Sequence, residues 1–354
     1  MTIITVIGSL NYDITTYINL IPSANETNLA DDVQYNLGGK GFNQCIGLTK
    51  SRSNENVEIR MIGSIGGKDN YGDLFLENLK LNKVLTSDIK KIEDSTTGLA
   101  NIIVESGRNH ANRIMVFPGA NKYTKFNETE LKSLFSNDDE EEFIVLQNEI
   151  PDPLAIINHL INPTNNYDSK FIIYNPSPFN AVKYIDPTMW SNINVLIVNE
   201  IEMFQLAQAL NVVSITDIAP DDKDDEFVQF FEKLIKPVAS AIKYPSTAVK
   251  KINGIIVVTL GGKGYIYYNH YTETLKYEPA SKLIAKPIDS TGCGDTFLGY
   301  FTTILAETLS DNKDDLDGKI LNALKTANIA AGIAITRNGA SSSIPFIKEV
   351  KDLI

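Results

Sequence analysis

Short apolar segments recur along the 354-residue chain, and each one ends in a polar or glycine-rich turn. Examples are IITVIGSLNYD, EIRMIGSIGG, FIVLQNE, FIIYNPS, NVLIVNE and GIIVVTLGGKG. Uninterrupted apolar strands are typical of a parallel sheet that is buried on both faces. Segments with helical character lie between several of them, for example residues 152–160 and 200–210. This alternation predicts an α/β fold with an open, doubly wound, mostly parallel sheet and helices on both faces.

A second pattern, in which apolar and polar residues roughly alternate, occurs in DITTYINL, DDVQYNL, GLANIIVES and NRIMVFPG. Alternation of this kind next to turn residues indicates half-exposed antiparallel strands. We expect residues of about 12–37 and 97–118 to form a small antiparallel sheet within a single domain spanning residues 1–354. An exposed hydrophobic face on this sheet needs a cover, so the sheet would serve as a lid or as a homodimer surface.

The composition restricts the class of partner. Acidic residues number 44 and basic residues 32, so the formal net charge is −12. Such a chain lacks the basic field that binders of nucleic acid or of anionic membranes normally need. Only two cysteines occur, no secretory leader pattern opens the chain, and no apolar run approaches the roughly 20 residues of a spanning helix. We expect a soluble cytoplasmic protein, also compatible with the nucleus of a eukaryote, that acts on small molecules.

Polar residues or glycine directly follow the apolar runs at Asn11, Asp13, Glu149, Asn175, Asn199 and Gly261. In open α/β sheets, ligands bind beyond the carboxyl ends of the strands. The pattern therefore predicts one rim of the sheet lined by carboxylates, amides and bare backbone. The sequence contains neither a G-x-x-x-x-G-K-[ST] phosphate loop nor a G-x-G-x-x-G dinucleotide fingerprint, and its three histidines form no zinc motif.

The heptapeptide DSTGCGD, residues 289–295, precedes an apolar helical pattern. Its small residues Gly292, Cys293 and Gly294 would let an anion approach the free N–H groups at the positive end of the helix dipole. Asp295 at the mouth of this anion hole could accept a proton from an alcohol while the N–H groups hold a phosphoryl group. Stabilisation of the helix start is the alternative role for Asp295. Asp289 is better suited to a cation beneath the loop.

Two motifs resemble those of a known family. DSTGCGD is similar to the D-T-x-G-x-G-D signature of the ribokinase and PfkB family of sugar kinases. GGKGFNQ, residues 38–44, preceded by GSLNYD at residues 8–13, resembles the N-terminal motif of the same family. The likeness extends from residue 3 to about GASSSIP at residues 339–345. The resemblance implies a ribokinase-like fold and an ATP-dependent kinase whose base is Asp295 and whose anion hole is formed by residues 292–294.

The resemblance also implies three sets of binding residues. The sugar would contact Asn11, Asp13, Gly39, Lys40, Asn43, Glu149 and Asp295. ATP and Mg²⁺ would be held by Asn199, Glu202, Thr259, Gly261, Gly264, Gly294 and Asn328. K⁺, as a monovalent activator, would be bound by Asp289, Thr291, Ala334, Arg337, Gly339 and Ser343, several of them through backbone carbonyls. Without the resemblance, Asn11 and Asp13 are interpreted as residues of a turn after the first strand. Glu202 is then interpreted as an acidic residue that stabilises the start of a helix.

The sequence departs from the family pattern at two positions where alanine is common. Phe42 is expected to narrow or reshape the sugar pocket, whereas Cys293 is small enough to leave the anion hole open. The GGKGFNQ motif favours D-ribose, phosphorylated at its 5-hydroxyl to ribose 5-phosphate, as the reaction. Fructose, 2-keto-3-deoxygluconate and adenosine are alternative acceptors. A pseudouridine-5'-phosphate glycosidase and a noncatalytic sugar-binding protein are the alternatives from other functional classes.

Overall fold

A computed structural model describes residues 2–105, 107, 111–136, 140–165, 167–179, 186–223, 225–245, 252–309 and 315–354. Its main sheet has the strand order β13-β12-β11-β10-β9-β8-β1-β4-β5. The bounds are β1 (Thr2–Ile7), β4 (Val57–Gly66), β5 (Ile89–Ile92), β8 (Glu142–Gln147), β9 (Lys170–Asn175), β10 (Val195–Asn199), β11 (Ile255–Thr259), β12 (Tyr265–Asn269) and β13 (Thr274–Glu278). Strands β1 to β11 of this sheet pair in parallel, and β12 and β13 add an antiparallel hairpin at one edge. The predicted mostly parallel sheet is confirmed.

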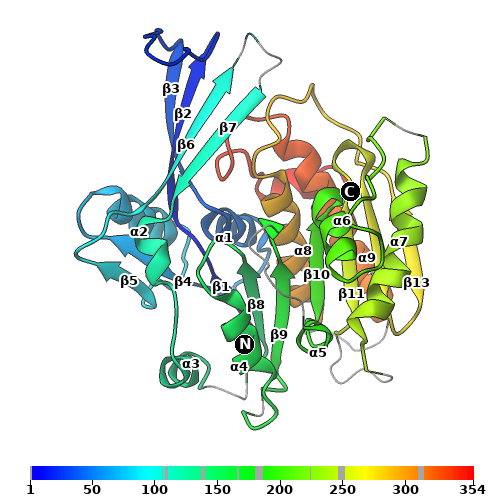
Figure 1. Ribbon diagram of the computed structural model, residues 1–354. Helices are drawn as coiled ribbons and strands as arrows, with labels where there is room; N and C mark the ends of the chain where they lie inside the picture. Colours follow the sequence, from blue (N-terminus) through cyan, green and yellow to red (C-terminus); the bar gives the residue numbers. More distant parts are fainter. Residues whose placement is uncertain are drawn as a thin grey trace.

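Helices cover both faces of this sheet (Figure 1). One face carries α1 (Lys40–Ser51), α2 (Tyr71–Leu81), α8 (Cys293–Leu309), α9 (Leu316–Ala334) and α10 (Ile347–Lys351). The other carries α3 (Glu128–Leu134), α4 (Pro153–Ile161), α5 (Pro187–Trp190), α6 (Glu200–Ala209) and α7 (Phe227–Ile242). Within β1, Ile4 and Val6 belong to the first apolar core and Ile7 to the second, and all three are fully buried. Burial on both faces explains why the strands are uninterrupted apolar runs.

A second, four-stranded sheet projects from the main body (Figure 1) and has the order β3-β2-β6-β7. Its strands are β2 (Asn11–Ile18), β3 (Asp32–Gly38), β6 (Gly98–Glu105) and β7 (Ala111–Phe117). We call it the lid sheet. The β2–β3 and β6–β7 pairs are antiparallel, as predicted, but β2 and β6 pair in parallel because both leave the main sheet in the same direction. Residues 106 and 108–110 of the predicted lid lie outside the described residues.

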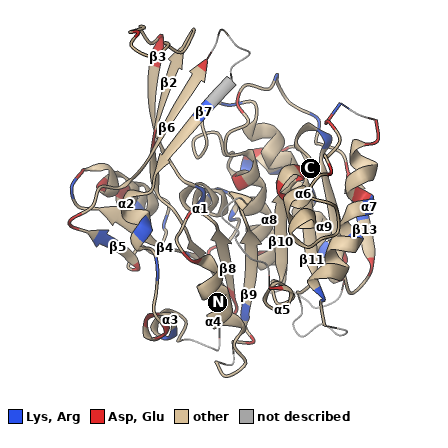
Figure 2. Ribbon diagram, viewed as in Figure 1, with Lys and Arg blue, Asp and Glu red and all other residues tan. Residues whose placement is uncertain are grey.

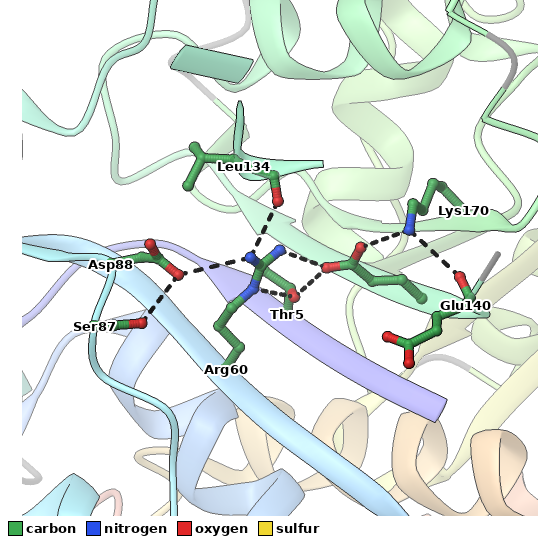
Figure 3. A network of polar contacts seen from close by, with 8 residues as sticks. Thr5, Arg60, Ser87, Asp88, Leu134, Glu140 and Lys170 are labelled. Atoms are coloured by element: carbon green, nitrogen blue, oxygen red, sulfur yellow. Dashed lines mark hydrogen bonds and ion pairs between the residues drawn. The ribbon is translucent and has the colours of Figure 1, made fainter. Parts of the chain in front are cut away.

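A buried ionic network crosses the main sheet near the amino ends of its strands (Figure 3). Arg60 donates to Thr5 Oγ1 at 3.0 Å and to Glu142 Oε1 at 2.7 Å, and Lys170 lies 3.1 Å from Glu142 Oε2. Glu142 and Lys170 are almost fully buried, so each charge depends on its partner. The network joins β4, β1, β8 and β9 at the edge opposite the predicted ligand rim.

Within the described ranges, no helix combines the length and the apolar character needed to cross a bilayer.

Candidate active site

The N-terminus of α8 presents bare backbone, as the sequence predicted. Cys293 donates its N–H to Ser290 O at 3.3 Å, and Thr296 donates to Gly292 O at 2.8 Å. Helix geometry leaves the N–H groups of Gly294 and Asp295 without an intrahelical acceptor. A Cβ on Gly294 would meet no heavy atom within 4 Å, so the space before these N–H groups is open. This end of α8 is suited to receive an anion.

At Gly292, in contrast to Gly294, the backbone conformation and the close packing require glycine. Its φ of 76° lies in the left-handed region, and an added Cβ would lie 2.8 Å from Ala340 Cα. Cys293 beside it stays a neutral thiol, because burial and the charges of Asp289 and Asp295 raise its pKa to about 12. The anion hole therefore gains no negative charge from Cys293.

Asp295 lies in the first turn of α8 and is only 8% exposed. Gln44 Nε2 donates to its Oδ1 at 2.9 Å, and Asn43 Nδ2 lies 3.3 Å from its Oδ2. Burial raises the pKa of Asp295 above its ordinary value, against the opposing effects of the Lys40 charge and of the hydrogen bonds from Gln44 and Asn43. The carboxylate is thus enclosed, held by amides and made more basic than a surface aspartate, which suits a group that accepts a proton.

Lys40 opens α1 and supplies the positive charge of the site. Burial by itself would lower the pKa of its ammonium, but the charges of Asp295, Glu149 and Glu202 together raise it above the ordinary value. Lys40 therefore remains protonated and balances the surrounding carboxylates.

A cavity of about 230 Å³ joins most of the predicted catalytic and phosphate-binding residues. Lys40 enters from α1, Asn199 and Glu202 from the β10–α6 junction, and Thr259 from the end of β11. Gly292, Gly294 and Asp295 complete the lining from α8. Residues from four separate parts of the chain meet here because the carboxyl ends of the parallel strands share one edge.

The predicted sugar-binding residues gather where the lid sheet joins the main sheet. Asn11 begins β2, is 3% exposed and accepts a hydrogen bond of 2.8 Å on Oδ1 from Asn121 Nδ2. Burial and the charges of Glu149 and Asp295 raise the pKa of Asp13 to about 7. Gly38 gives this carboxylate its space, because an added Cβ would lie 2.0 Å from Asp13 Oδ2.

Glu149 follows β8 and is fixed through one oxygen. Its Oε2 accepts hydrogen bonds from the hydroxyl of Ser9 and, at 2.9 Å, from the backbone N–H of Lys40. Gly39 allows the chain to turn tightly into α1 here, since its φ is 86° and a Cβ would lie 2.8 Å from Asn11 N. Its Oε1 accepts no hydrogen bond from the part of the chain that the structure describes, so it is available to a ligand.

Sequence reasoning did not assign Ser9, Gln44, Asn121 or Gln147. Asn121 is 1% exposed and binds both backbone groups of Leu10 as well as Asn11, so it joins η2 (Gly119–Tyr123) to the base of the lid sheet. Gln44 lies inside the motif GGKGFNQ, and that position was the available signal for it. Ser9 likewise lies inside the motif GSLNYD, whereas no pattern in the sequence marks Asn121 or Gln147.

Asn199 and Glu202 form a reciprocal cap at the start of α6. Glu202 N donates to Asn199 Oδ1 at 2.8 Å, and Asn199 N donates to Glu202 Oε2 at 3.0 Å. The helix-start role that the sequence allowed for Glu202 is therefore present. Both residues also line the 230 Å³ cavity, which places oxygen donors beside the anion hole.

A second cavity, of about 570 Å³, lies beside the segment 278–284 and α9. Asn328 lines it and donates from Nδ2 to Pro279 O at 2.9 Å, while Leu283, Ile284 and Ile329 supply apolar surface. An apolar slot with a few polar groups suits a flat heterocycle.

The two predicted glycines that follow β11 differ from each other. Gly261, with φ of 52°, has open space where a Cβ would be, as expected for a position that a ligand approaches. Gly264 instead packs against the end of β13, since a Cβ would lie 2.1 Å from Glu278 O. The structure therefore gives Gly264 a packing role at the β12–β13 hairpin.

The predicted cation-binding residues meet at the loop between α9 and α10. Asp289 accepts hydrogen bonds of 2.9 Å from Thr291 N and from Gly339 N, so its carboxylate joins the two segments. The guanidinium of Arg337 pairs with Glu349, and Ser343 Oγ donates to Ala340 O at 2.7 Å. Ala334 ends α9 in the same segment. Among the described residues, no group of three or more His, Cys, Asp or Glu side chains has a geometry that could hold a metal ion, so a cation here would depend on backbone carbonyls.

Phe42 does not occupy the place that the sequence suggested. Its side chain is fully buried in the core beneath α1, and its ring packs edge-on against Phe75 with centroids 4.9 Å apart. The expectation that it narrows the sugar pocket is corrected, because the first helical turn directs this side chain into the core.

Comparison with known proteins agrees with this geometry. A family model described as pfkB family carbohydrate kinase matches residues 1–347. A ribokinase of Lactococcus lactis is 31% identical over 358 residues, which cover 99% of this chain and 96% of the relative. The crystal structure of a ribokinase from Cryptococcus neoformans in complex with ADP is 26% identical, covers 100% of this chain and 99% of that one, and has a TM-score of 0.73. A ribokinase structure from Giardia lamblia is 25% identical, covers 99% and 98%, and has a TM-score of 0.79. This chain belongs to the pfkB family of carbohydrate kinases.

Proposed function

We propose that this protein transfers the γ-phosphoryl group of ATP to the 5-hydroxyl of D-ribose, giving ribose 5-phosphate and ADP. The observation that carries the proposal is the position of Asp295, an enclosed carboxylate at the open N-terminus of α8, in one cavity with Lys40. Relatives named ribokinase that match over nearly the whole chain support ribose as the acceptor. A kinase needs a base beside an anion hole, and this site supplies both.

In the proposed reaction, the carboxylate of Asp295 accepts the proton of the sugar hydroxyl as the hydroxyl oxygen attacks the γ-phosphorus. The bond from that phosphorus to the bridging oxygen breaks in line, and ADP leaves. The N–H groups of residues 292–294 stabilise the charge that develops on the phosphoryl oxygens. Lys40 adds a fixed positive charge at the same place, supported by its surrounding carboxylates.

The sugar would be oriented by the polar groups at the base of the lid sheet. Asn11, Asp13 and Glu149 offer an amide and two carboxylates, which suit adjacent hydroxyl groups, and Gly39 and Asn43 would close over the ring. The adenine would enter the 570 Å³ cavity beside Asn328, with Thr259 and Gly261 along the path to the phosphates and Gly264 supporting that path by its packing against the end of β13. A site built for hydroxyls rejects sugars that lack them, because its polar groups would then be unpaired.

Two cations complete the proposal. Asn199 and Glu202 are oxygen donors that face the phosphate cavity and suit Mg²⁺, which would neutralise charge on the phosphates of ATP. K⁺ would be held by Asp289 and by carbonyls of Thr291, Ala334, Arg337 and Gly339, with Ser343. Because Asp289 directly precedes the anion hole, a cation there would stabilise the loop conformation that exposes the N–H groups.

The lid sheet would close over the sugar and, through its exposed apolar strands, form a homodimer. On its edge strand β7, Ile114, Met115, Val116 and Phe117 are each more than half exposed. Few charged residues interrupt the lid strands (Figure 2). An apolar surface of this kind is usually covered by a partner, and a lid that excludes water limits wasteful hydrolysis of ATP.

The deciding experiment measures ADP release from ATP with a panel of acceptors: D-ribose, 2-deoxyribose, fructose, 2-keto-3-deoxygluconate and adenosine. We expect the highest kcat/KM with D-ribose and a product whose phosphorus-31 spectrum shows a 5-phosphate ester. A preference for another acceptor would assign a different substrate within the family. Cleavage of pseudouridine 5'-phosphate without ATP, in the absence of kinase activity, would contradict the proposal.

A further inference from the structure

Three amide side chains lie around the carboxylate of Asp295, two of them buried and the third, that of Asn175, half-buried at the lining of the phosphate cavity. Gln44 of α1 and Gln147 at the end of β8 are both fully buried, and Asn175 ends β9. Gln44 Nε2 donates to Asp295 Oδ1 at 2.9 Å and to Asn175 Oδ1 at 3.3 Å. Gln44 Oε1 accepts a hydrogen bond of 2.7 Å from Gln147 Nε2. Every polar atom of the Gln44 side chain is therefore engaged.

The direction of these hydrogen bonds is fixed by the main chain. Asn175 Nδ2 lies 2.9 Å from the backbone carbonyl of Ile197 in β10, and a carbonyl can only accept. The amide of Asn175 must therefore turn its oxygen toward Gln44, since amide ends are assigned by their partners. Gln44 must in turn present its nitrogen to Asn175 and to Asp295. A reversed Gln44 would place its oxygen against two other oxygens.

In this arrangement one polar atom of the Gln147 side chain lacks a hydrogen bond. Its Oε1 is buried and has no hydrogen-bond partner among the described residues. Gly8 gives this oxygen its room, because an added Cβ would lie 2.2 Å from it. An unpaired buried carbonyl destabilises a fold, and such groups call for an explanation in function. Here the explanation is that Nε2 of Gln147 is directed to Gln44.

We propose that Gln44, oriented by Gln147 and Asn175, is a positioning residue that occupies Oδ1 of Asp295 and directs Oδ2 toward the attacking hydroxyl. The inference rests on the proposed kinase reaction, in which Asp295 accepts the proton. Among the described residues, Oδ2 has only the longer 3.3 Å contact with Asn43, which is itself a proposed sugar-binding residue. The carboxylate is thereby held in one rotation, with one oxygen engaged and the other available.

The hydrogen bond from Gln44 also acts on the charge of Asp295. Burial favours the protonated form of this carboxyl group and so raises its pKa, whereas an amide donor favours the carboxylate. Loss of the donor should therefore leave a smaller fraction of the base deprotonated at neutral pH. A purely structural role for Gln44 would not produce this change in the pH dependence.

The test compares Gln44→Leu and Gln147→Leu with the wild type in single-turnover phosphorylation of ribose, measured against pH at saturating sugar and ATP. Single turnover isolates the transfer step from product release, and saturating sugar keeps Asp13 engaged. We expect Gln44→Leu to move the acidic limb of the pH–rate profile to higher pH. The rate at pH 7 should fall by about tenfold to a hundredfold, which is the usual effect of losing a hydrogen bond to a charged group. Gln147→Leu should shift the limb in the same direction by less. The affinity for ADP should stay unchanged in both.

Asn194→Leu is the matched control. Asn194 is an equally buried amide, bonded to Ile172 N and Ile252 O near the amino end of β10, far from Asp295. This variant should lose stability without any change of the acidic limb. The inference is overturned if the acidic limb of the pH–rate profile of Gln44→Leu superimposes on that of the wild type. If Gln44→Leu does not fold, the same comparison is made with Gln147→Leu. Absence of ribose phosphorylation by the wild type would instead remove the proposed function itself, so the two failures are distinguishable.

Discussion

Asn43 Nδ2 lies 3.3 Å from Asp295 Oδ2, although the two residues are 252 positions apart in the chain. The motif GGKGFNQ and the motif DSTGCGD therefore meet at a single carboxylate. The contact follows from the packing of α1 beside α8: a Cβ on Gly299 of α8 would lie 2.7 Å from the backbone of Gly47 in α1. Two glycines at the crossing allow this close approach.

Asp295→Asn should lower kcat by about 10²- to 10⁴-fold, the usual contribution of a general base. The volume and most contacts are kept, so ADP affinity should be nearly unchanged. A coupled assay of ADP release and calorimetric titration with ADP measure the two effects. Asp317→Asn serves as the control, because Asp317 is hydrogen-bonded to Tyr267 and Asn269 away from the cavity and should affect stability alone. Near-normal turnover by Asp295→Asn would reject Asp295 as the base.

Gly294→Ala should fold normally yet impair phosphoryl transfer. The added methyl group meets no protein atom within 4 Å, so it would occupy the space before the N–H groups of α8. Gly292→Ala should behave differently, with a loss of folding stability, because φ is 76° and its Cβ would crowd Ala340. Thermal unfolding and kcat/KM for ATP separate the two outcomes. Equal thermal stability of both variants would contradict the assignment.

Asp13 should make the stability of the ligand-free protein depend on pH. The folded protein holds this proton up to about pH 7, whereas the ordinary pKa of an aspartate is 3.8. Its contribution to stability is therefore complete below 3.8 and is lost as pH rises through about 7. The free energy of urea unfolding of Asp13→Asn, relative to wild type, should increase between pH 5 and pH 8. A difference that stays constant over this range would exclude the raised pKa.

Replacement of K⁺ by tetramethylammonium at constant ionic strength should depress kcat, because the bulky ion cannot enter a carbonyl-lined site. Asp289→Ala should weaken the activation by K⁺. The carboxylate of Asp289 accepts hydrogen bonds from the backbone N–H groups of Thr291 and Gly339, so its loss would loosen the two loops that form the proposed cation site. Titration of activity with KCl gives both results. Equal rates in the two salts would refute the cation site.

The protein should sediment and scatter light as a dimer at micromolar concentration. Val116 and Met115 are neighbours in the edge strand β7, so their side chains point to opposite faces of the sheet. Val116→Lys and Met115→Lys are therefore compared, and the variant that weakens the dimer identifies the face that is buried in it. Ile215→Lys is the control, because Ile215 is 85% exposed outside the lid sheet. A monomeric wild-type protein would remove the dimer proposal.

Much of the fold could be predicted because burial on two faces imposes uninterrupted apolar strands, as β1 and β10 illustrate. The β12–β13 hairpin was not predicted, since YIYYN does not differ in composition from a buried parallel strand. The parallel β2–β6 pairing was also missed, because period-two alternation does not specify the direction of the neighbouring strand. Phe42 was misplaced for a related reason: the motif gave its position in the chain but not the direction of its side chain.

By itself the sequence determined the layers of the protein and the two motifs that carry Asp295 and Lys40, because periodicity and small residues act through local backbone geometry. Only the tertiary structure decided which distant groups touch. It brought Asn121 to Asn11, Ser9 to Glu149, and the amide pair Gln147–Gln44 to the base. Hydrogen bonds between remote side chains depend on strand order and helix packing, and neither is encoded in the spacing of neighbouring residues.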